Sequence, residues 1–196
     1  MLFSIERSLF GEGLARIGDQ FYQLTWRNGL AFVYRYDTAG QRLSRTATYR
    51  HEGEGWGLTD FDNELVLSDG SDKLSFLDPK TFTVLRQVPV RLGGHPVRYL
   101  NELESVDQLI LANIYGDSSV VAIDPANGCV TTVIDASRLF AAMKEKFESL
   151  PDPICAGPCS PWDFVLNGIA YDPQAGELYI TGKNWPLIFV YRGLIG

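Results

Sequence analysis

The residues best suited to chemistry lie in short turns, each of which precedes an apolar strand. Glu12 stands between Gly11 and Gly13, and two glycines let the backbone approach a neighbouring segment closely. Trp56 and Asn101 occupy corresponding turns further along the chain. A carboxylate, an amide and an indole can together bind a small ligand by charge, hydrogen bonding and aromatic contact. An isolated carboxylate in such a turn is more often simply solvated, so the interpretation depends on whether the fold brings these turns together.

The turns recur at a regular interval that is typical of a repeat fold. Gly13, Gly57 and Glu102 follow one another roughly 45 residues apart, a period seen in β-propeller blades. Each interval contains four short strand patterns separated by turn residues, and a last copy opens at Asn167 after a longer interval. In a propeller the first strand of every blade lines the central channel. We therefore predict an all-β propeller, with a single domain over residues 1–196, in which these turns face one axis.

The longer interval is explained by a helix. Apolar residues recur there at helical spacing. They are Leu139, Phe140, Met143, Phe147 and Leu150. The pattern predicts a helix that begins after Asp135 or Ser137 as the N-cap and ends at Pro151, within a helix-and-loop insertion over about residues 136–162.

Composition narrows the classes of partner. The net charge is −7 and no basic stripe occurs, so neither nucleic acid nor an anionic membrane is an expected partner. No apolar run is long enough to cross a bilayer.

The three cysteines and two histidines give little support for a metal site. Cys129 stands in a strand pattern and is expected in the core. Cys155 and Cys159 enclose the short sequence CAGPC within a proline-rich loop, where a disulfide is compatible with export and a metal site is less well supported because no second pair of cysteines or histidines accompanies them. His51 and His95 are isolated in predicted loops, which argues against a catalytic zinc site.

Longer motifs in the same turns and strands resemble those of the plant and bacterial glutaminyl-peptide cyclotransferases. They are FGEG with YQLTW, GEGWGL with LVLSDGSDKLSFLDP, LNELE with ANIY, and LNGIAYDP with LYITGKNWP. The motifs follow in the family's order and spacing from Phe10 onward. The resemblance implies a propeller of the five-bladed type, with about four blades in this chain and one helical insertion before the last. It also implies an enzyme that converts the N-terminal glutamine of a peptide into pyroglutamate and releases ammonia.

The resemblance also implies roles for particular residues. Glu12 matches the family's proton shuttle, and Asn101 and Lys183 match the polar groups at the oxygen of the reacting amide. Five residues are expected to bind substrate, and they are Phe10, Gln23, Trp26, Trp56 and Tyr115.

Several of these residues have simpler interpretations that the sequence leaves open. Lys183 has the alternative of a solvated loop lysine, and Asn101 that of a turn residue bonded to its own backbone. The tryptophans Trp26 and Trp56 have the alternative of packing inside the blades. Glu102 and Glu104 are interpreted as supporting residues, and Trp185 is expected to pack between blades rather than to touch substrate.

Two departures from the family pattern bear on activity. Tyr115 stands where the family usually has tryptophan, which keeps an aromatic wall and adds a hydroxyl group. The family's blade ahead of FGEG is not found, and residues 2–9 are expected to form its last strand. Four repeats of a five-blade ring would leave open sheet edges through which the chain could self-associate. The alternative function is therefore an inactive or truncated propeller that serves as a peptide-binding or scaffold module.

The remaining expectations concern cofactors and compartment. The resemblance implies no cofactor and no catalytic metal, while backbone carbonyls around the channel are compatible with a structural calcium ion that nothing in the sequence locates. The expected partners are peptides or proteins with an N-terminal glutamine. The family favours a periplasmic or secreted location, but this chain shows no signal peptide, so the compartment stays unknown.

Overall fold

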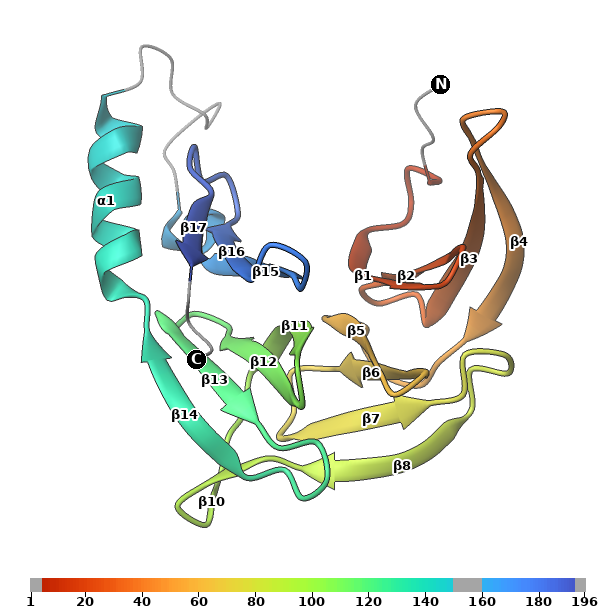
Figure 1. The fold of residues 1–196 in the computed structure, drawn as a ribbon, viewed down its shortest axis with the longest axis horizontal. Helices are drawn as coiled ribbons and strands as arrows, with labels where there is room; N and C mark the ends of the chain where they lie inside the picture. The colour runs from red at the N-terminus through yellow and green to blue at the C-terminus, as the bar shows by residue number, and fades with distance from the viewer. Residues whose placement is uncertain (1–4, 150–159, 193–196) are drawn as a thin grey trace.

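The computed structural model describes residues 5–149 and 160–192, which form four larger antiparallel sheets placed around a common centre, and one small two-stranded sheet (Figure 1). The first sheet contains β1 (Gly11–Ile17), β2 (Gln20–Thr25), β3 (Leu30–Asp37) and β4 (Arg42–Arg50). The second contains β5 (Leu58–Phe61), β6 (Glu64–Ser68), β7 (Lys73–Leu77) and β8 (Val84–Pro89). The third contains β11 (Leu100–Val106), β12 (Leu109–Ile114), β13 (Ser119–Ile123) and β14 (Val130–Asp135). The fourth contains β15 (Leu166–Asp172), β16 (Glu177–Gly182) and β17 (Phe189–Arg192).

In each of the four larger sheets the strands pair in chain order, and the first strand lies innermost (Figure 1). The innermost strands contact one another from sheet to sheet, β1 with β5, β5 with β11, and β11 with β15. The predicted all-β, propeller-like arrangement of four blades is therefore confirmed. Because a blade is covered on both faces by its neighbours, its middle strands carry nearly continuous apolar runs, whereas outer strands such as β4 and β14 are largely exposed.

Three apolar clusters fill the spaces between neighbouring sheets. The cluster between the first and second sheets includes Leu24 and Leu65, and the cluster between the second and third includes Phe76 and Leu103. The third cluster joins the third and fourth sheets and includes Leu139 from the helix. Because each cluster draws on two sheets, packing within it sets the angle between them, and that angle decides which turns meet at the centre.

The turns between strands have the residues that the sequence analysis expected. Gly18 has a φ of 62° in the β1–β2 hairpin, and Asp62 and Asn63 have φ values of 49° and 63° between β5 and β6. Positive φ at both central residues suits a tight hairpin and favours aspartate and asparagine. At the blade end after β7, the carboxylate of Asp78 accepts a hydrogen bond from the backbone N–H of Lys80 at 2.7 Å, as expected of a turn residue.

The predicted helical insertion is present as α1 (Ser137–Glu148) and the 3₁₀ helix η1 (Pro161–Phe164). The prediction of Asp135 or Ser137 as N-cap was wrong, because Ala136 occupies that position. The carboxylate of Asp135 nevertheless satisfies a free donor of the first turn, since it accepts the N–H of Ser137 at 2.8 Å. Cys155 and Cys159 lie outside the described residues.

Three further expectations need correction. Residues 5–10 form no strand, and the N–H of Leu9 instead closes a turn on the carbonyl of Glu6 at 2.9 Å. Cys129 is exposed rather than in the core, because it lies at the end of the turn just before β14 begins, where its N–H donates to the Asn127 side chain at 2.8 Å. His95 lies not in a loop but in β10 (His95–Pro96), which pairs with β9 (Arg91–Leu92) as a small hairpin.

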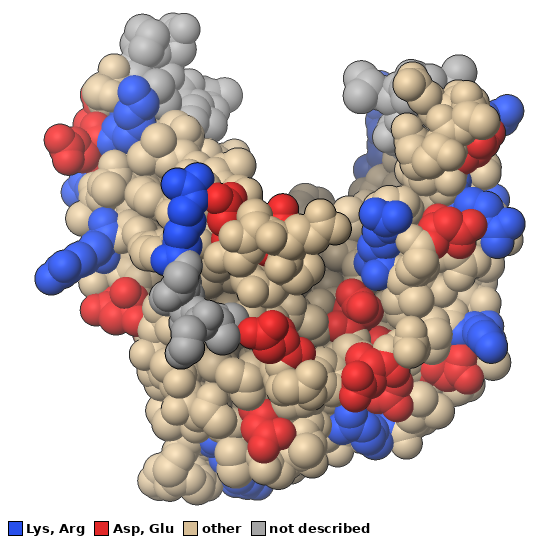
Figure 2. Space-filling view, in the orientation of Figure 1, with Lys and Arg blue, Asp and Glu red and all other residues tan. Residues whose placement is uncertain are grey.

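The surface of the described residues is mixed in charge. Figure 2 shows acidic and basic side chains interspersed over one face, and a hollow between the arm that carries α1 and the arm that carries β3 and β4. Among residues 5–149 and 160–192, no helix has the length and apolar character to cross a membrane.

Candidate active site

β-Bulges lie at matching positions of three innermost strands and aim their side chains toward the centre. The ladder of β1 shifts register between Gly11 and Leu14, that of β11 between Leu100 and Leu103, and that of β15 between Leu166 and Ile169. A bulge inserts an extra residue and re-aims the side chains beside it. The inserted segments are the ones that carry Glu12, Asn101 and Asn167, so the recurrence found in the sequence has a structural cause.

A cavity of about 130 Å³ lies where these turns meet. Its lining residues come from all four sheets, and they are Phe10, Glu12, Trp26, Trp56, Asn101, Tyr115 and Lys183. The fold thus brings the carboxylate, the amide and the ammonium predicted as a catalytic set to one small cavity, together with four of the five residues predicted to bind substrate.

Gln23 is the predicted site residue that does not line this cavity. It lies behind the wall, where its amide oxygen accepts a hydrogen bond from the Tyr34 hydroxyl at 3.2 Å. Its amide nitrogen packs on Gly11 so closely that a Cβ at that glycine would stand 2.7 Å away. Gln23 therefore supports the backbone that carries Phe10 and Glu12.

Glu12 lies in an environment that favours its protonated form. Burial raises the pKa of the Glu12 carboxyl above its usual range, and the positive charge of Lys183 offsets part of that rise. Gly13 explains how Glu12 can sit so close to the second sheet, because its N–H donates to the Trp56 carbonyl at 2.8 Å. A Cβ at Gly13 would meet backbone atoms of the second sheet at 2.6–2.8 Å.

Glu102 and Glu104 are two further buried carboxyl groups near the site, and both have raised pKa values. Burial raises the pKa of Glu102 to about 8, and the nearby charges of Glu104 and Glu12 add to that rise. Burial raises the pKa of Glu104 to about 7, although the carboxylate accepts the N–H of Tyr171 at 2.7 Å. Neither carboxyl lines the cavity, which agrees with the supporting role assigned from the sequence.

Asn101 is buried, with only 4% of the residue exposed, and hydrogen bonds hold it in place. Its Nδ2 donates to Oδ1 of Asn167 at 3.0 Å, and its backbone carbonyl accepts the Ser68 hydroxyl at 2.6 Å. Ser68 in turn accepts the N–H of Gly57 at 2.8 Å, which ties the second sheet to the third. An asparagine amide has two N–H donors, and no described residue takes the second, so Asn101 can donate one hydrogen bond into the cavity.

Asn113 is a supporting residue that the sequence analysis missed. It is fully buried, its Oδ1 accepts the N–H of Glu102 at 2.9 Å, and its Nδ2 donates to the carbonyl of Leu166 at 2.6 Å. The side chain thereby joins the bulge of β11 to the start of β15. Its place in the ANIY motif was the available signal, because an amide inside an otherwise apolar strand must find partners when it is buried.

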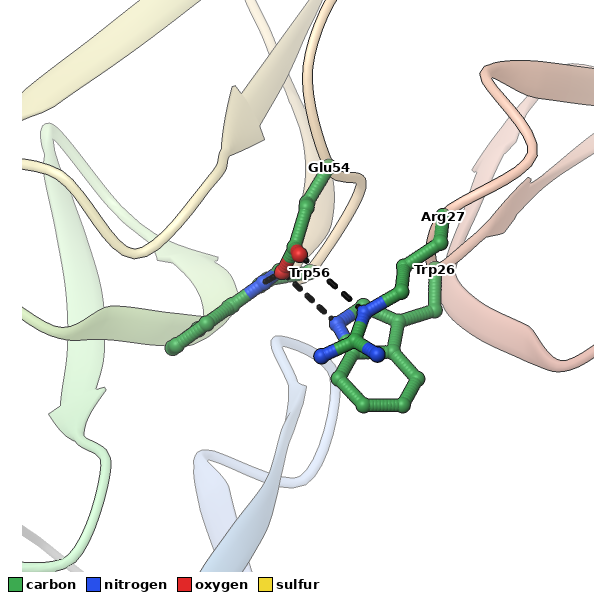
Figure 3. Close-up of polar contacts among 4 residues, drawn as sticks. All are labelled: Trp26, Arg27, Glu54 and Trp56. Atoms are coloured by element: carbon green, nitrogen blue, oxygen red, sulfur yellow. Dashed lines mark hydrogen bonds and ion pairs between the residues drawn. The ribbon is translucent and has the colours of Figure 1, made fainter.

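Glu54 joins the two tryptophan walls of the cavity, and it was also missed. Oε2 of Glu54 accepts the indole N–H of Trp26 at 2.8 Å and that of Trp56 at 2.9 Å (Figure 3). Oε1 pairs with Nε of Arg27 at 3.2 Å, and the Arg27 guanidinium lies 3.7 Å from the centre of the Trp26 ring. These hydrogen bonds lower the pKa of Glu54, that of Trp56 contributing most. The sequence held one signal for this role, because Gly53-Glu54-Gly55 repeats the Gly-Glu-Gly pattern found around Glu12.

Tyr115 completes the aromatic wall on the side of the third sheet. Its ring meets Trp56 edge-on with centres 5.5 Å apart, and Nζ of Lys183 lies 5.5 Å from its centre. Its outer side stacks on Trp162 of η1 with centres 5.8 Å apart. Trp185 packs away from the cavity, as predicted, with its indole N–H bonded to the Phe164 carbonyl at 2.7 Å.

Among the described residues, no three histidine, cysteine, aspartate or glutamate side chains gather in a way that could hold a metal ion. This cavity can therefore move a proton at Glu12, donate one hydrogen bond from Asn101 and place positive charge from Lys183, all between aromatic walls.

Comparison with known proteins places this geometry in a family. A family profile described as glutamine cyclotransferase matches residues 2–192. The chain is 32% identical over 190 residues to a glutaminyl-peptide cyclotransferase of Arabidopsis thaliana, an alignment that covers 96% of this chain and 54% of the relative. The chain therefore spans about half the length of that curated relative. It is also similar to a crystal structure of Myxococcus xanthus glutaminyl cyclase, with 42% identity, a TM-score of 0.82, and coverage of 93% of this chain and 72% of the other.

Proposed function

Because the chain belongs to the glutamine cyclotransferase family, we propose that it cyclises the N-terminal glutamine of peptides to pyroglutamate and releases ammonia. One observation supports this proposal above the rest, namely that Glu12, Asn101 and Lys183 line a single cavity of about 130 Å³ between aromatic walls. Substrates are peptides or proteins that begin with glutamine. The reaction is an intramolecular acyl transfer, in which the α-amine attacks the γ-carbonyl carbon of the same residue.

Glu12 acts as the proton shuttle in this proposal. As the new C–N bond forms, the ionised carboxylate accepts a proton from the attacking amine. It then delivers that proton to the departing nitrogen, which leaves as ammonia. A carboxyl whose pKa is raised by burial is better matched to an amine than an ordinary carboxyl, because proton transfer is most efficient between groups of similar pKa near the working pH.

Asn101 and Lys183 stabilise the oxyanion of the tetrahedral intermediate. The free N–H of Asn101 and the ammonium of Lys183 supply a hydrogen bond and a positive charge to the oxygen as it becomes negative. Phe10, Trp26, Trp56 and Tyr115 exclude water and hold the glutamine side chain folded toward its own amine. These groups account for proton transfer and charge, so we assign no role to a metal ion or cofactor, and we expect a chelator to leave the rate unchanged.

The direct test is ammonia release from a glutamine-initiated dipeptide by the purified chain. Glu12→Gln keeps the size of the side chain but cannot carry the proton, and we expect the rate to fall by roughly 10²–10⁴, the usual contribution of general acid–base catalysis. Glu145→Gln on the exposed side of α1 is the matched control, with an unchanged rate expected. A Glu12→Gln protein that retains the full rate would remove Glu12 from the mechanism. Peptide binding without ammonia release would instead favour a peptide-binding or scaffold module.

The proposal extends to architecture and location. The resemblance to the family supports a ring of the five-bladed type, and family membership supports action in the periplasm or outside the cell. β17 is the outer strand of the last sheet among the described residues, and an unpaired strand edge can pair with another chain. We propose weak self-association there, which light scattering over a range of protein concentrations would detect.

A further inference from the structure

Trp162 extends the aromatic wall of the cavity onto the outer surface. Trp162 is 59% exposed as a residue, although its ring stacks on Tyr115, which lines the cavity. The two rings are nearly parallel, with an interplanar angle of 10°. Exposed tryptophans are unusual because the indole offers a large apolar area, so a tryptophan held open beside a substrate cavity indicates a contact surface.

The position of Trp162 is set by a rigid local structure. Ser160 and Asp163 form a reciprocal capping box at the start of η1, with the N–H of Ser160 donating to Asp163 at 2.7 Å. The carbonyl of Asp163 accepts Nδ2 of Asn184 at 3.0 Å, and Asn184 follows Lys183 directly. The indole therefore keeps a fixed place relative to the cavity.

Gly116 lets the indole approach the third sheet. Its φ is 82°, and a Cβ at this position would stand 2.9 Å from Trp162. Trp162 also lines a second cavity of about 340 Å³, which is close to the first because its lining residue Gly116 directly follows Tyr115. Trp162, Phe140, Val165 and Leu166 make its lining mainly apolar.

We propose that Trp162 and this second cavity form a subsite for the side chain of the residue that follows the N-terminal glutamine. The inference rests on the proposed cyclisation, which places the glutamine against Trp56 and Tyr115. Ring centres 5.5 Å and 5.8 Å apart lead from Trp56 through Tyr115 to Trp162. An extended residue spans about 3.3–3.6 Å, so the residue after the glutamine lies within side-chain reach of Trp162.

The lining defines the side chains that this subsite takes. An aromatic or large aliphatic side chain can stack on the free face of Trp162 and enter the space beside Phe140, whereas glycine makes neither contact. The carboxylate of Asp117 also lines the cavity and disfavours an acidic residue there. The expected order of preference at the second position is phenylalanine or leucine first, then glycine, then aspartate.

The test compares kcat/KM for three tripeptide amides that begin Gln-Phe, Gln-Gly and Gln-Asp. We expect the protein to prefer Gln-Phe over Gln-Gly by about tenfold, the scale of a well-formed ring contact. Trp162→Ala should reduce that ratio to about twofold, because the stacking surface is gone, and Trp162→Phe should keep most of it. Tyr36→Ala is the matched control, an exposed aromatic on β3 that lines neither cavity, and should leave the ratio unchanged.

Two results would overturn the subsite while leaving the cyclisation intact. One is a wild-type protein that turns over Gln-Gly as fast as Gln-Phe, and the other is a folded Trp162→Ala protein that keeps the full ratio. No turnover of any of the three peptides would count against the proposed function instead. The subsite would then be judged by calorimetry, where equal Kd values for the Gln-Phe and Gln-Gly peptides would refute it.

Discussion

Removing the carboxylate of Glu54 should loosen both tryptophan walls at once, since Trp26 and Trp56 share its Oε2 at 2.8 and 2.9 Å (Figure 3). A hydrogen bond to a charged group contributes about 1.5–3 kcal/mol when well formed. The Glu54 side chain is 39% exposed, so water can replace part of each bond and the lower end of that range applies. The ion pair with Arg27 adds little, because the Arg27 side chain is 66% exposed.

We therefore expect Glu54→Ala to cost about 2 kcal/mol in transition-state binding, which corresponds to about a 30-fold loss in kcat/KM. KM should rise more than kcat falls, because the walls hold the glutamine side chain but take no part in proton transfer. Glu54→Gln keeps an oxygen that can accept both indole N–H groups without the charge, so its loss should be smaller, about fivefold.

Ammonia release from a glutamine-initiated dipeptide measures both parameters, and tryptophan fluorescence gives an independent readout. Trp26 and Trp56 are two of the four tryptophans, so their release from Glu54 should change the emission spectrum. Arg27→Ala is the comparison variant, since it removes the exposed ion pair and the guanidinium over the Trp26 ring but leaves both indole bonds, and its kcat/KM should fall less than about fivefold. The reasoning is refuted if a folded Glu54→Ala protein keeps the wild-type KM.

Three other predictions concern charge and packing around the same cavity. The charge of Lys183 lowers the raised pKa of Glu12, so in Lys183→Ala the acidic limb of the pH–rate profile should move to higher pH than in the wild type. An unchanged limb would show that Lys183 does not influence the pKa of Glu12. Folding raises the pKa of Glu102 from 4.5 to about 8. The contribution of protonated Glu102 to the free energy of unfolding is therefore largely present at pH 5 and is lost as the pH rises through about 8. Glu102→Gln mimics the protonated form, so its free energy of unfolding should be close to that of the wild type at pH 5. At pH 9 it should exceed the wild-type value by on the order of 3 kcal/mol, while Glu145→Gln should show no such trend. Gly13→Ala would place a Cβ 2.6 Å from backbone of the second sheet, and a loss of about 1–3 kcal/mol in urea unfolding, with reduced activity, is expected; full stability would contradict that contact.

Much of the architecture could be predicted because turns and helices depend on residue types that lie close together in the sequence. Gly18 and the pair Asp62 and Asn63 adopt the positive φ angles that tight hairpins need, and residues of these types are the ones that tolerate them. The apolar spacing of Leu139 and Met143 located α1, and both side chains are buried. Where local signals were ambiguous the predictions failed, as at Cys129, which has the pattern of a strand but lies in an exposed bridge.

The candidate site could be located from the sequence only in part. The interval between turns predicted that Glu12 and Asn101 would face one axis, because a propeller brings equivalent turns to its centre, and the family resemblance added Lys183; all three line one cavity. The family resemblance placed Gln23 in the pocket wall, whereas Gln23 does not line the cavity and its amide oxygen accepts a hydrogen bond from Tyr34. Alternation along a strand says which face a side chain occupies, but the bulge in β1 changes that register.

The sequence by itself determined the repeats and the turns, since each follows from spacing along one stretch of chain. Only the tertiary structure decided that Glu54 joins two indoles, that Asn101 bonds Asn167, and that Trp162 stacks on Tyr115. Those contacts link different sheets, and they depend on the angle at which neighbouring sheets pack. That angle is set by the apolar clusters as a whole, so no single stretch of sequence contains it.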